Sequence, residues 1–216
     1  MPSPTPLPSP PKPTSDAPRA ARAALIAAAA LVAGGGLAVW LVLPYPSLPV
    51  LGAVPSFTLV ERSGRPVSAA DLAGHVWVAD FVFTRCPSFC PTLTARMAGL
   101  QRTLAPAADP VRLVSFSVDP AHDTPEVLLD YARSAGAGDG WLFVTGPREA
   151  VAGLLRDGFK VAWADDGPPA SLITHSDRFV LVDRALRIRG YYHGTEADDV
   201  ARLARDALAL SAGKTS

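Results

Sequence analysis

Apolar residues along the chain gather in short runs whose length and composition are typical of β-strands. The run 76–83, VWVADFVF, combines β-branched and aromatic residues over the length of a strand, so it predicts a central strand covered on both faces. The runs 111–118 and 141–144 predict two further strands. This pattern indicates a β-sheet with a buried middle.

Other stretches show helical spacing. Apolar residues after Cys90 recur at helical intervals with arginines between them, which predicts an amphipathic helix. Its apolar positions are Leu93, Met97, Leu100 and Leu104. Thr124 and Pro125 form an N-cap and first-position pair that opens a second helix, reaching about residue 133. Thr195 with Asp198 resembles a capping box and predicts a last amphipathic helix through residue 210.

Two hairpins complete the pattern. The apolar segment 57–60 and Val67 flank a Ser-Gly turn, and the segments 179–182 and 188–192 are separated by a short polar loop. Strands that alternate with helices, followed by a hairpin and a closing helix, predict an α/β or α+β fold in which helices flank a mixed β-sheet.

The first part of the chain differs in composition from the rest. Eight prolines lie within the first eighteen residues, so residues 1–22 are expected to form a disordered cytoplasmic tail. Residues 23–43 carry no charge and, as a helix of about 32 Å, match the thickness of a bilayer. Basic residues precede them, so an uncleaved single-pass anchor places the remainder on the periplasmic or extracytoplasmic side of the cytoplasmic membrane; a cleaved signal peptide is the alternative. Residues 44–54 are expected to be a linker and residues 55–212 the folded domain.

Charge and cysteine content exclude several classes of function. The 216 residues contain 20 Lys+Arg and 20 Asp+Glu, and this neutral balance argues against a nucleic-acid partner. A hydrophobic content of 49% is enough for a core and excludes global disorder. The 2 cysteines are too few for a disulfide framework or an all-cysteine zinc site. Among cysteine-based sites, only one built on two thiols remains.

Cys86 and Cys90 directly follow the predicted central strand, four positions apart. If helical geometry begins near Cys86, both sulfurs lie on one face and can meet one metal ion or each other. A helix N-terminus stabilises thiolate, the form that ligates metal and attacks disulfides. Three interpretations follow: a redox dithiol suited to an oxidising exported compartment, a soft-metal site that selects copper, or two small apolar residues that fill the core.

A third ligand would separate these interpretations. His175 precedes the predicted strand at 179–182, and a loop entering a strand beside the central one could bring its imidazole to the thiols. His75 is expected in an exposed loop, and His122 and Asp123 are expected at the start of a helix. From spacing alone, an ordinary surface or core group is the more common explanation for any one histidine.

Four segments in order are similar to the Sco/SenC family: FVFTRCPSFCPTLT (81–94), SVDPAHDTPEVLLDYA (117–132), WLFVTG (141–146) and ITHSDRFVLVDRALRIRGYYHG (173–194). The resemblance implies a thioredoxin-like fold that faces the periplasm. It also implies that Cys86, Cys90 and His175 bind one copper ion per chain. The implied role is assembly of the dinuclear copper centre of cytochrome c oxidase, with the copper-accepting subunit of that enzyme as partner.

Three positions bear on this resemblance. Ser88 stands inside the cysteine loop where many members have an acidic residue, and His193 follows the paired tyrosines where Asp is common. His193 is interpreted as a turn residue. Thr174 precedes His175 where ordinary thioredoxins place a cis-proline that keeps metal away from the thiols, so its presence fits copper binding.

The functional expectation is thus a membrane-anchored copper chaperone, with other periplasmic thiol or copper carrier proteins as further partners. The first alternative is a membrane-tethered thiol-disulfide oxidoreductase in which Cys86 attacks and Cys90 resolves the mixed disulfide. The second is a copper-sensing or scaffolding module that binds copper without passing it on.

Two further features have competing interpretations. Asp119 follows a strand, where its carboxylate could orient the site or simply form a turn with Pro120. The aromatic residues of the later strands are more often core than part of a partner-binding face. They are Trp141, Trp163, Tyr191 and Tyr192.

Overall fold

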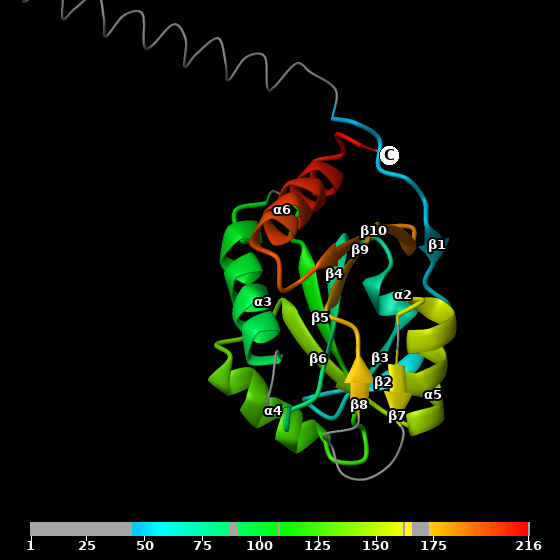
Figure 1. The fold of residues 1–216 in the computed structure, drawn as a ribbon. Coiled ribbons are helices and arrows are strands. Elements are labelled where there is room, and N and C mark those ends of the chain that lie inside the picture. The colour runs from blue at the N-terminus through cyan, green and yellow to red at the C-terminus, as the bar shows by residue number, and fades with distance from the viewer. Residues whose placement is uncertain (1–44, 87–89, 108, 162, 166–172, 216) are drawn as a thin grey trace, which may run out of the picture. The chain divides into compact units, whose positions relative to one another are not determined.

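An eight-stranded mixed sheet organises the protein, with helices on both faces (Figure 1). The computed structural model describes residues 45–86, 90–107, 109–161, 163–165 and 173–215, with the side chains of 163–165 and 173–175 left out of the description. The order of the strands across the sheet is β1-β10-β9-β4-β5-β6-β2-β3. These strands are β1 (Gly52–Ala53), β2 (Thr58–Glu61), β3 (Pro66–Ser68), β4 (Trp77–Val82), β5 (Arg112–Ser117), β6 (Trp141–Thr145), β9 (Arg178–Val182) and β10 (Arg187–His193).

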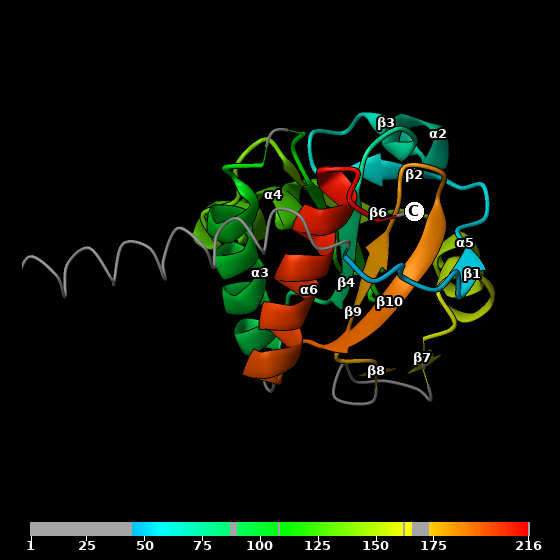
Figure 2. The same cartoon turned by 90° about the horizontal axis from the view of Figure 1, so that it is seen from above.

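The helices form two groups, one on each face. Helix α3 lies beside α6 on one face, and α4 follows on the same side, as both views show (Figures 1 and 2). The other face carries α2 and a helix that continues into a π-helical turn, η1. The bounds are α2 (Ala69–Leu72), α3 (Cys90–Leu104), α4 (Pro125–Ser134), α5 (Arg148–Gly153), η1 (Leu154–Gly158) and α6 (Ala197–Ser211).

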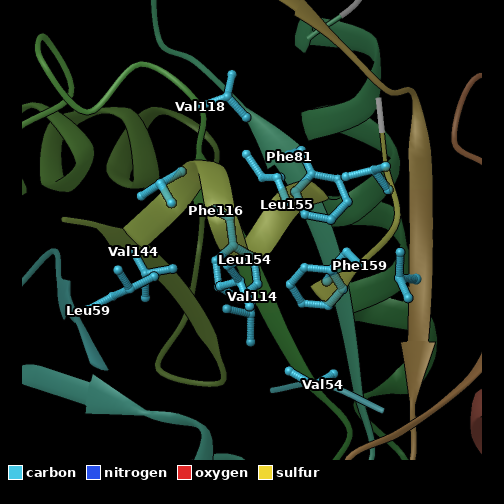
Figure 3. Packing of buried hydrophobic residues seen from close by; sticks show 14 of the residues in the cluster. Val54, Leu59, Phe81, Val114, Phe116, Val118, Val144, Leu154, Leu155 and Phe159 are labelled. Carbon is cyan, nitrogen blue, oxygen red and sulfur yellow. The ribbon is translucent and has the colours of Figure 1, made fainter. Parts of the chain in front are cut away.

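Strand β4 lies in the middle of the sheet, parallel to β5 and antiparallel to β9, and its residues are all buried. Its side chains alternate between two cores. On one side, Phe81 packs with Phe116 and Phe159 beneath η1, with a centroid distance of 5.2 Å between the rings of Phe81 and Phe159 (Figure 3). On the other side, Val78 belongs to the core under α3, α4 and α6. The expectation of a central strand covered on both faces is confirmed.

The other expected elements of the sheet and helices are also confirmed. Strands form at the expected places, including the hairpins β2–β3 and β9–β10. Thr124 caps α4 by accepting a hydrogen bond from the backbone N–H of Val127. Trp141 and Tyr192 lie in the core, whereas Tyr191 is half-buried and the side chain of Trp163 lies outside the described residues.

The capping box expected at Thr195 is wrong. The hydroxyl of Thr195 donates to Asp177 at 2.9 Å, and α6 begins only at Ala197. The hydroxyl is drawn into a tertiary hydrogen bond that local spacing does not reveal. In addition, the carboxylate of Asp199 accepts from the backbone N–H of His193, which ties the start of α6 to β10.

Several elements were not expected from the sequence. Three of them are β1, α2 and the α5–η1 segment. A further one is a separate pair of antiparallel strands, β7 (Trp163–Asp165) and β8 (Ile173–His175), in which His175 pairs with Trp163. His175 therefore lies at the end of a short strand rather than in a loop. His75 is half-buried, with its Nδ1 buried, rather than exposed.

The segment Tyr45–Ala53, which we call the N-terminal strap, packs along the domain. It lies in the same compact unit as the rest of the described chain. The buried guanidinium of Arg189 donates to the carbonyl oxygens of Leu48 and Pro49, and Tyr45 donates to the carboxylate of Asp206. Most of the stretch expected as a linker is thus held against the domain.

The expected tail 1–22 and membrane span 23–43 lie outside the described residues. Within the part of the chain that the structure describes, none of the helices has the length and apolar character needed to span a membrane.

Candidate functional site

The two cysteines meet where β4 leads into α3. Cys90 is the first residue of α3 and is buried, whereas Cys86 is half-buried after a turn in which its N–H donates to the carbonyl oxygen of Phe83 at 3.2 Å. The side chains of Cys86 and Cys90 are within hydrogen-bonding contact and are not joined by a disulfide bond. The structure thus brings both sulfurs to one place.

Burial raises the pKa of the Cys90 thiol far above its usual range, and the hydrogen bond with Cys86 adds to the effect. The helix N-terminus was expected to favour thiolate, but at Cys90 the loss of solvation outweighs it. A half-buried thiol is easier to reach than a buried one, so Cys86 is the sulfur that an incoming partner meets first.

A buried carboxylate fixes the loop that carries Cys86. Asp123 is fully buried and accepts hydrogen bonds from the hydroxyls of Thr84 and Ser117, each at 2.7 Å. Burial raises the pKa of Asp123, and the hydrogen bonds from Thr84 and Ser117 oppose that rise. Because Thr84 follows β4 and Ser117 ends β5, Asp123 joins the ends of two neighbouring strands next to the thiols.

Asp119 combines both of its expected roles. Its carboxylate forms an ion pair at 2.6 Å with Arg85, the residue that precedes Cys86. Its backbone carbonyl oxygen accepts a hydrogen bond from the N–H of His122 in a turn. Its own N–H donates to the hydroxyl of Ser117 at 3.1 Å. The residue therefore forms a turn and orients the chain beside the thiol pair.

A second buried carboxyl group, Asp80, lies in β4. One oxygen accepts from the Ser115 hydroxyl at 2.5 Å, and that hydroxyl in turn accepts from the indole N–H of Trp141 at 2.8 Å. The other oxygen has no hydrogen-bond partner in the described part of the chain. Burial raises the pKa of Asp80 to about 7, opposed by the Ser115 hydrogen bond. The charge of Asp80 acts on Cys90 and Tyr131, raising the pKa of each.

The third expected ligand is His175, which lies in β8. The backbone of His175 is placed in β8, but its side chain lies outside the described residues. Among the residues whose side chains are described, no group of three or more His, Cys, Asp or Glu is arranged to hold a metal ion. His193 is engaged elsewhere, since its Nδ1 lies 3.0 Å from the carboxylate of Asp177. The ligand set of two cysteines and His175 stays a prediction.

Sequence reasoning identified the thiols and Asp119 but missed Asp80 and Asp123. Asp80 is visible as a lone carboxylate within an apolar run, a signal of a buried acid that needs a partner. Asp123 was assigned to the start of a helix, and nothing in its neighbourhood indicates that it is fully buried.

Comparisons with known proteins show which family this chain resembles. The SCO1/SenC family model matches residues 51–209. The SCO1 protein homolog of Bacillus subtilis is 35% identical over 145 residues, which cover 66% of this chain and 75% of that protein.

Two solved structures are similar as a whole. BsSco is described as a member of the Sco family of cytochrome c oxidase assembly proteins with a disulfide switch; it is 32% identical, with a TM-score of 0.69, over 77% of this chain and 98% of that one. Copper-bound ScoI of Bradyrhizobium japonicum is 22% identical with a TM-score of 0.63, over 73% of this chain and 99% of that one. At that lower identity, ScoI shows the shared fold alone.

Proposed function

The chain belongs to the SCO1/SenC family, and from this premise we propose that it is a copper chaperone that delivers copper to cytochrome c oxidase. In this proposal Cys86, Cys90 and His175 hold one copper ion, and the recipient is the subunit that houses the dinuclear copper centre of the oxidase. The description of BsSco as a member of the Sco family of cytochrome c oxidase assembly proteins supports this assignment.

The observation that carries the proposal is the contact between Cys86 and Cys90 at the β4–α3 junction. Two soft thiolates select monovalent copper, and an imidazole such as that of His175 makes divalent copper acceptable as well. Asp123 and Asp119 hold the two residues that precede Cys86, Thr84 by a hydrogen bond and Arg85 by an ion pair, and so fix the chain that leads to the first thiol.

The difference in burial between the thiols suits transfer by exchange of ligands. An incoming thiolate first replaces the half-buried Cys86, while the buried Cys90 still holds the metal. Each proton lost when copper binds is regained as a cysteine is released. The order of exchange therefore follows from which sulfur a partner can reach.

The membrane anchor belongs to the same proposal. The uncharged stretch 23–43, with basic residues before it, would tether the domain to the cytoplasmic membrane on its periplasmic or extracytoplasmic side.

The copper content of serine variants tests the binding site. We expect the wild type, reduced and loaded with excess monovalent copper and then desalted, to retain one copper per chain. Cys86→Ser and Cys90→Ser should each lose it, because one thiolate does not hold the ion against washing. Ser63→Ala, a change in the β2–β3 turn, serves as the control. Full copper occupancy in either cysteine variant would contradict the shared site.

A thiol-disulfide oxidoreductase is the second candidate function, favoured by the direct contact of the two thiols and by the disulfide switch described for BsSco. The thiolate of Cys86 would attack a partner disulfide, and Cys90 would displace the partner from the mixed disulfide. The chain is oxidised to a disulfide while the partner gains two thiols. His175→Ala would leave this reaction intact and would weaken divalent copper binding, so the variant separates the two functions.

A further inference from the structure

Most basic residues in the described part of the chain are paired through their side chains. The side chains of five others make neither a hydrogen bond nor an ion pair. They are Arg96, Arg102, Lys160, Arg178 and Arg205. Lys160 and Arg178 line one depression of about 620 Å³, together with Leu51, Val161, Ser176 and Tyr191. We call these six residues the basic depression. The other three unpaired cations lie in a groove between α3 and α6.

The basic depression lies partly at the end of the sheet that carries the thiols. Ser176 directly follows His175, and Arg178 begins β9. Strand β9 runs antiparallel to β4, so Arg178 lies toward the end of β4 that leads to Cys86. Val161 belongs to the buried core against which both Cys86 and Tyr191 pack. Arg178 and the thiols are therefore presented at the same end of the sheet.

An apolar contact area adjoins these charges. Val50 and Leu51 of the N-terminal strap are 56% and 49% exposed, and they are the large hydrophobic residues found exposed in the described part of the chain. Tyr191 adds a half-buried aromatic ring. Apolar and aromatic contacts surrounded by charge are typical of protein-binding surfaces.

Lys160 and Arg178 interact electrostatically with Asp157 and Asp177, but these acids are hydrogen-bonded to other groups and not to the two cations. The carboxylate of Asp157 is bound by Arg156 at 3.2 Å, and that of Asp177 is shared between His193 at 3.0 Å and Thr195 at 2.9 Å. The backbone of Lys160 has φ 55, in the left-handed region, which is costly for a lysine. Its position in the rim of the depression is thus held by the surrounding fold.

We propose that the basic depression is the docking surface for the copper acceptor, and that the acceptor meets it with carboxylates around an apolar contact. This inference rests on the proposed function, because exchange of ligands requires the acceptor thiols to approach Cys86 closely. The unpaired Lys160 and Arg178 supply the charge to which such a partner is complementary.

Kinetics of copper transfer test the proposal. The full chain in neutral detergent is loaded with monovalent copper and mixed with the reduced, copper-free soluble domain of the copper-accepting oxidase subunit. We expect Lys160→Glu and Arg178→Glu each to retain copper but to lower the bimolecular transfer rate on the order of tenfold, and to weaken its decrease with salt. Arg102→Glu, an equally unpaired arginine in the α3–α6 groove, should transfer at the wild-type rate.

The outcomes separate the two proposals. If the wild type transfers copper and both variants match Arg102→Glu at every salt concentration, the docking surface is overturned and the chaperone function stands. If the wild type binds copper but transfers none, delivery fails, and binding of the copper-free acceptor domain is measured directly. Weaker binding by Lys160→Glu would then still support the surface, and equal binding, or none, would overturn it.

Discussion

Two buried carboxyl groups flank the thiol pair, and the fold treats them differently. Asp123 receives hydrogen bonds on both oxygens from Thr84 and Ser117, so it holds two loops together. Asp80 is bonded on one oxygen only, by Ser115, and its burial therefore favours the protonated form. One group is a fixed link in the structure, and the other changes charge near neutral pH.

The stability of the domain should accordingly depend on the protonation of Asp80. Burial raises the pKa of Asp80 from 3.8 to about 7, so the folded state holds a proton that the unfolded state releases. The resulting stabilisation is complete below about pH 4 and is lost as pH rises through about 7, with an upper limit on the order of 4 kcal/mol. We expect Asp80→Asn to remove this loss of stability at higher pH.

The measurement is the free energy of unfolding in urea at pH 5 and pH 8 for the wild type and Asp80→Asn. The difference between the two pH values should be smaller in the variant. Ser63→Ala, at an exposed turn, should keep the wild-type difference. An identical difference in Asp80→Asn would show that this carboxyl group does not change charge in the range considered.

At the residue scale, the sequence was sufficient for groups whose role is local. Cys86 and Cys90 are close in the chain, so their contact could be predicted from spacing. Asp80 and Ser115 are separated by 35 positions, and their hydrogen bond exists only because β4 pairs with β5 in the observed register. Thr195 was assigned wrongly for the same reason, since its partner Asp177 lies on a different element.

Among the elements, those with long and regular patterns were predicted well, such as β4 and α3. The α5–η1 segment was missed because glycines at 153 and 158 weaken the helical signal and the π-helical turn shifts its apolar face. The β7–β8 pair is too short to produce a distinct pattern. Its presence changes the expected surroundings of His175 from a loop to a strand end.

One buried cation bonds the middle of the N-terminal strap. The guanidinium of Arg189 is 1% exposed; it bonds the carbonyl oxygens of Leu48 and Pro49 and forms an ion pair with Asp183 at 2.8 Å. Replacing it removes these bonds and leaves buried acceptors unpaired. We expect Arg189→Met to lower the free energy of unfolding by about 3 kcal/mol and to expose the strap to proteases.

Arg187→Met is the matched control, because the side chain of Arg187 pairs with the same carboxylate of Asp183 but is 44% exposed. Only the backbone of Arg187 lies against the strap, opposite Ala53, and the substitution leaves that backbone pairing in place. Limited proteolysis followed by mass analysis of the fragments is the readout. Cleavage within residues 45–53 should appear in Arg189→Met before cleavage elsewhere, and in neither the control nor the wild type. Equal resistance of all three proteins would show that the strap is held by other contacts.

For the whole molecule, the sequence predicted a mixed sheet flanked by helices, and the resemblance implied the Sco fold. The strand order could not be predicted from the sequence, because it depends on which segments pair across the sheet; β2, for example, pairs with β6. The N-terminal strap is the other difference. It belongs to the expected linker, yet it bonds to Arg189 and Asp206 of the domain, while the expected domain start at Pro55 stays a prediction.

Truncation tests where the folded unit begins. A chain that starts at Tyr45 should fold and stay monodisperse, since its core lies wholly within the retained residues. A chain that starts at Pro55 loses β1 and the bonds of the strap to Arg189 and Asp206, so its melting temperature should be clearly lower. Equal melting temperatures would mean that the strap adds no stability.

The most direct test of the account is the spectrum of divalent copper bound to the full chain, compared with His175→Ala and the control His122→Ala. We predict one copper per chain, a sulfur-to-copper charge-transfer band and a paramagnetic signal in the wild type and in His122→Ala. In His175→Ala the band and the signal should be lost while the Cys86–Cys90 disulfide still forms. An unchanged spectrum in His175→Ala would contradict the three-ligand copper site.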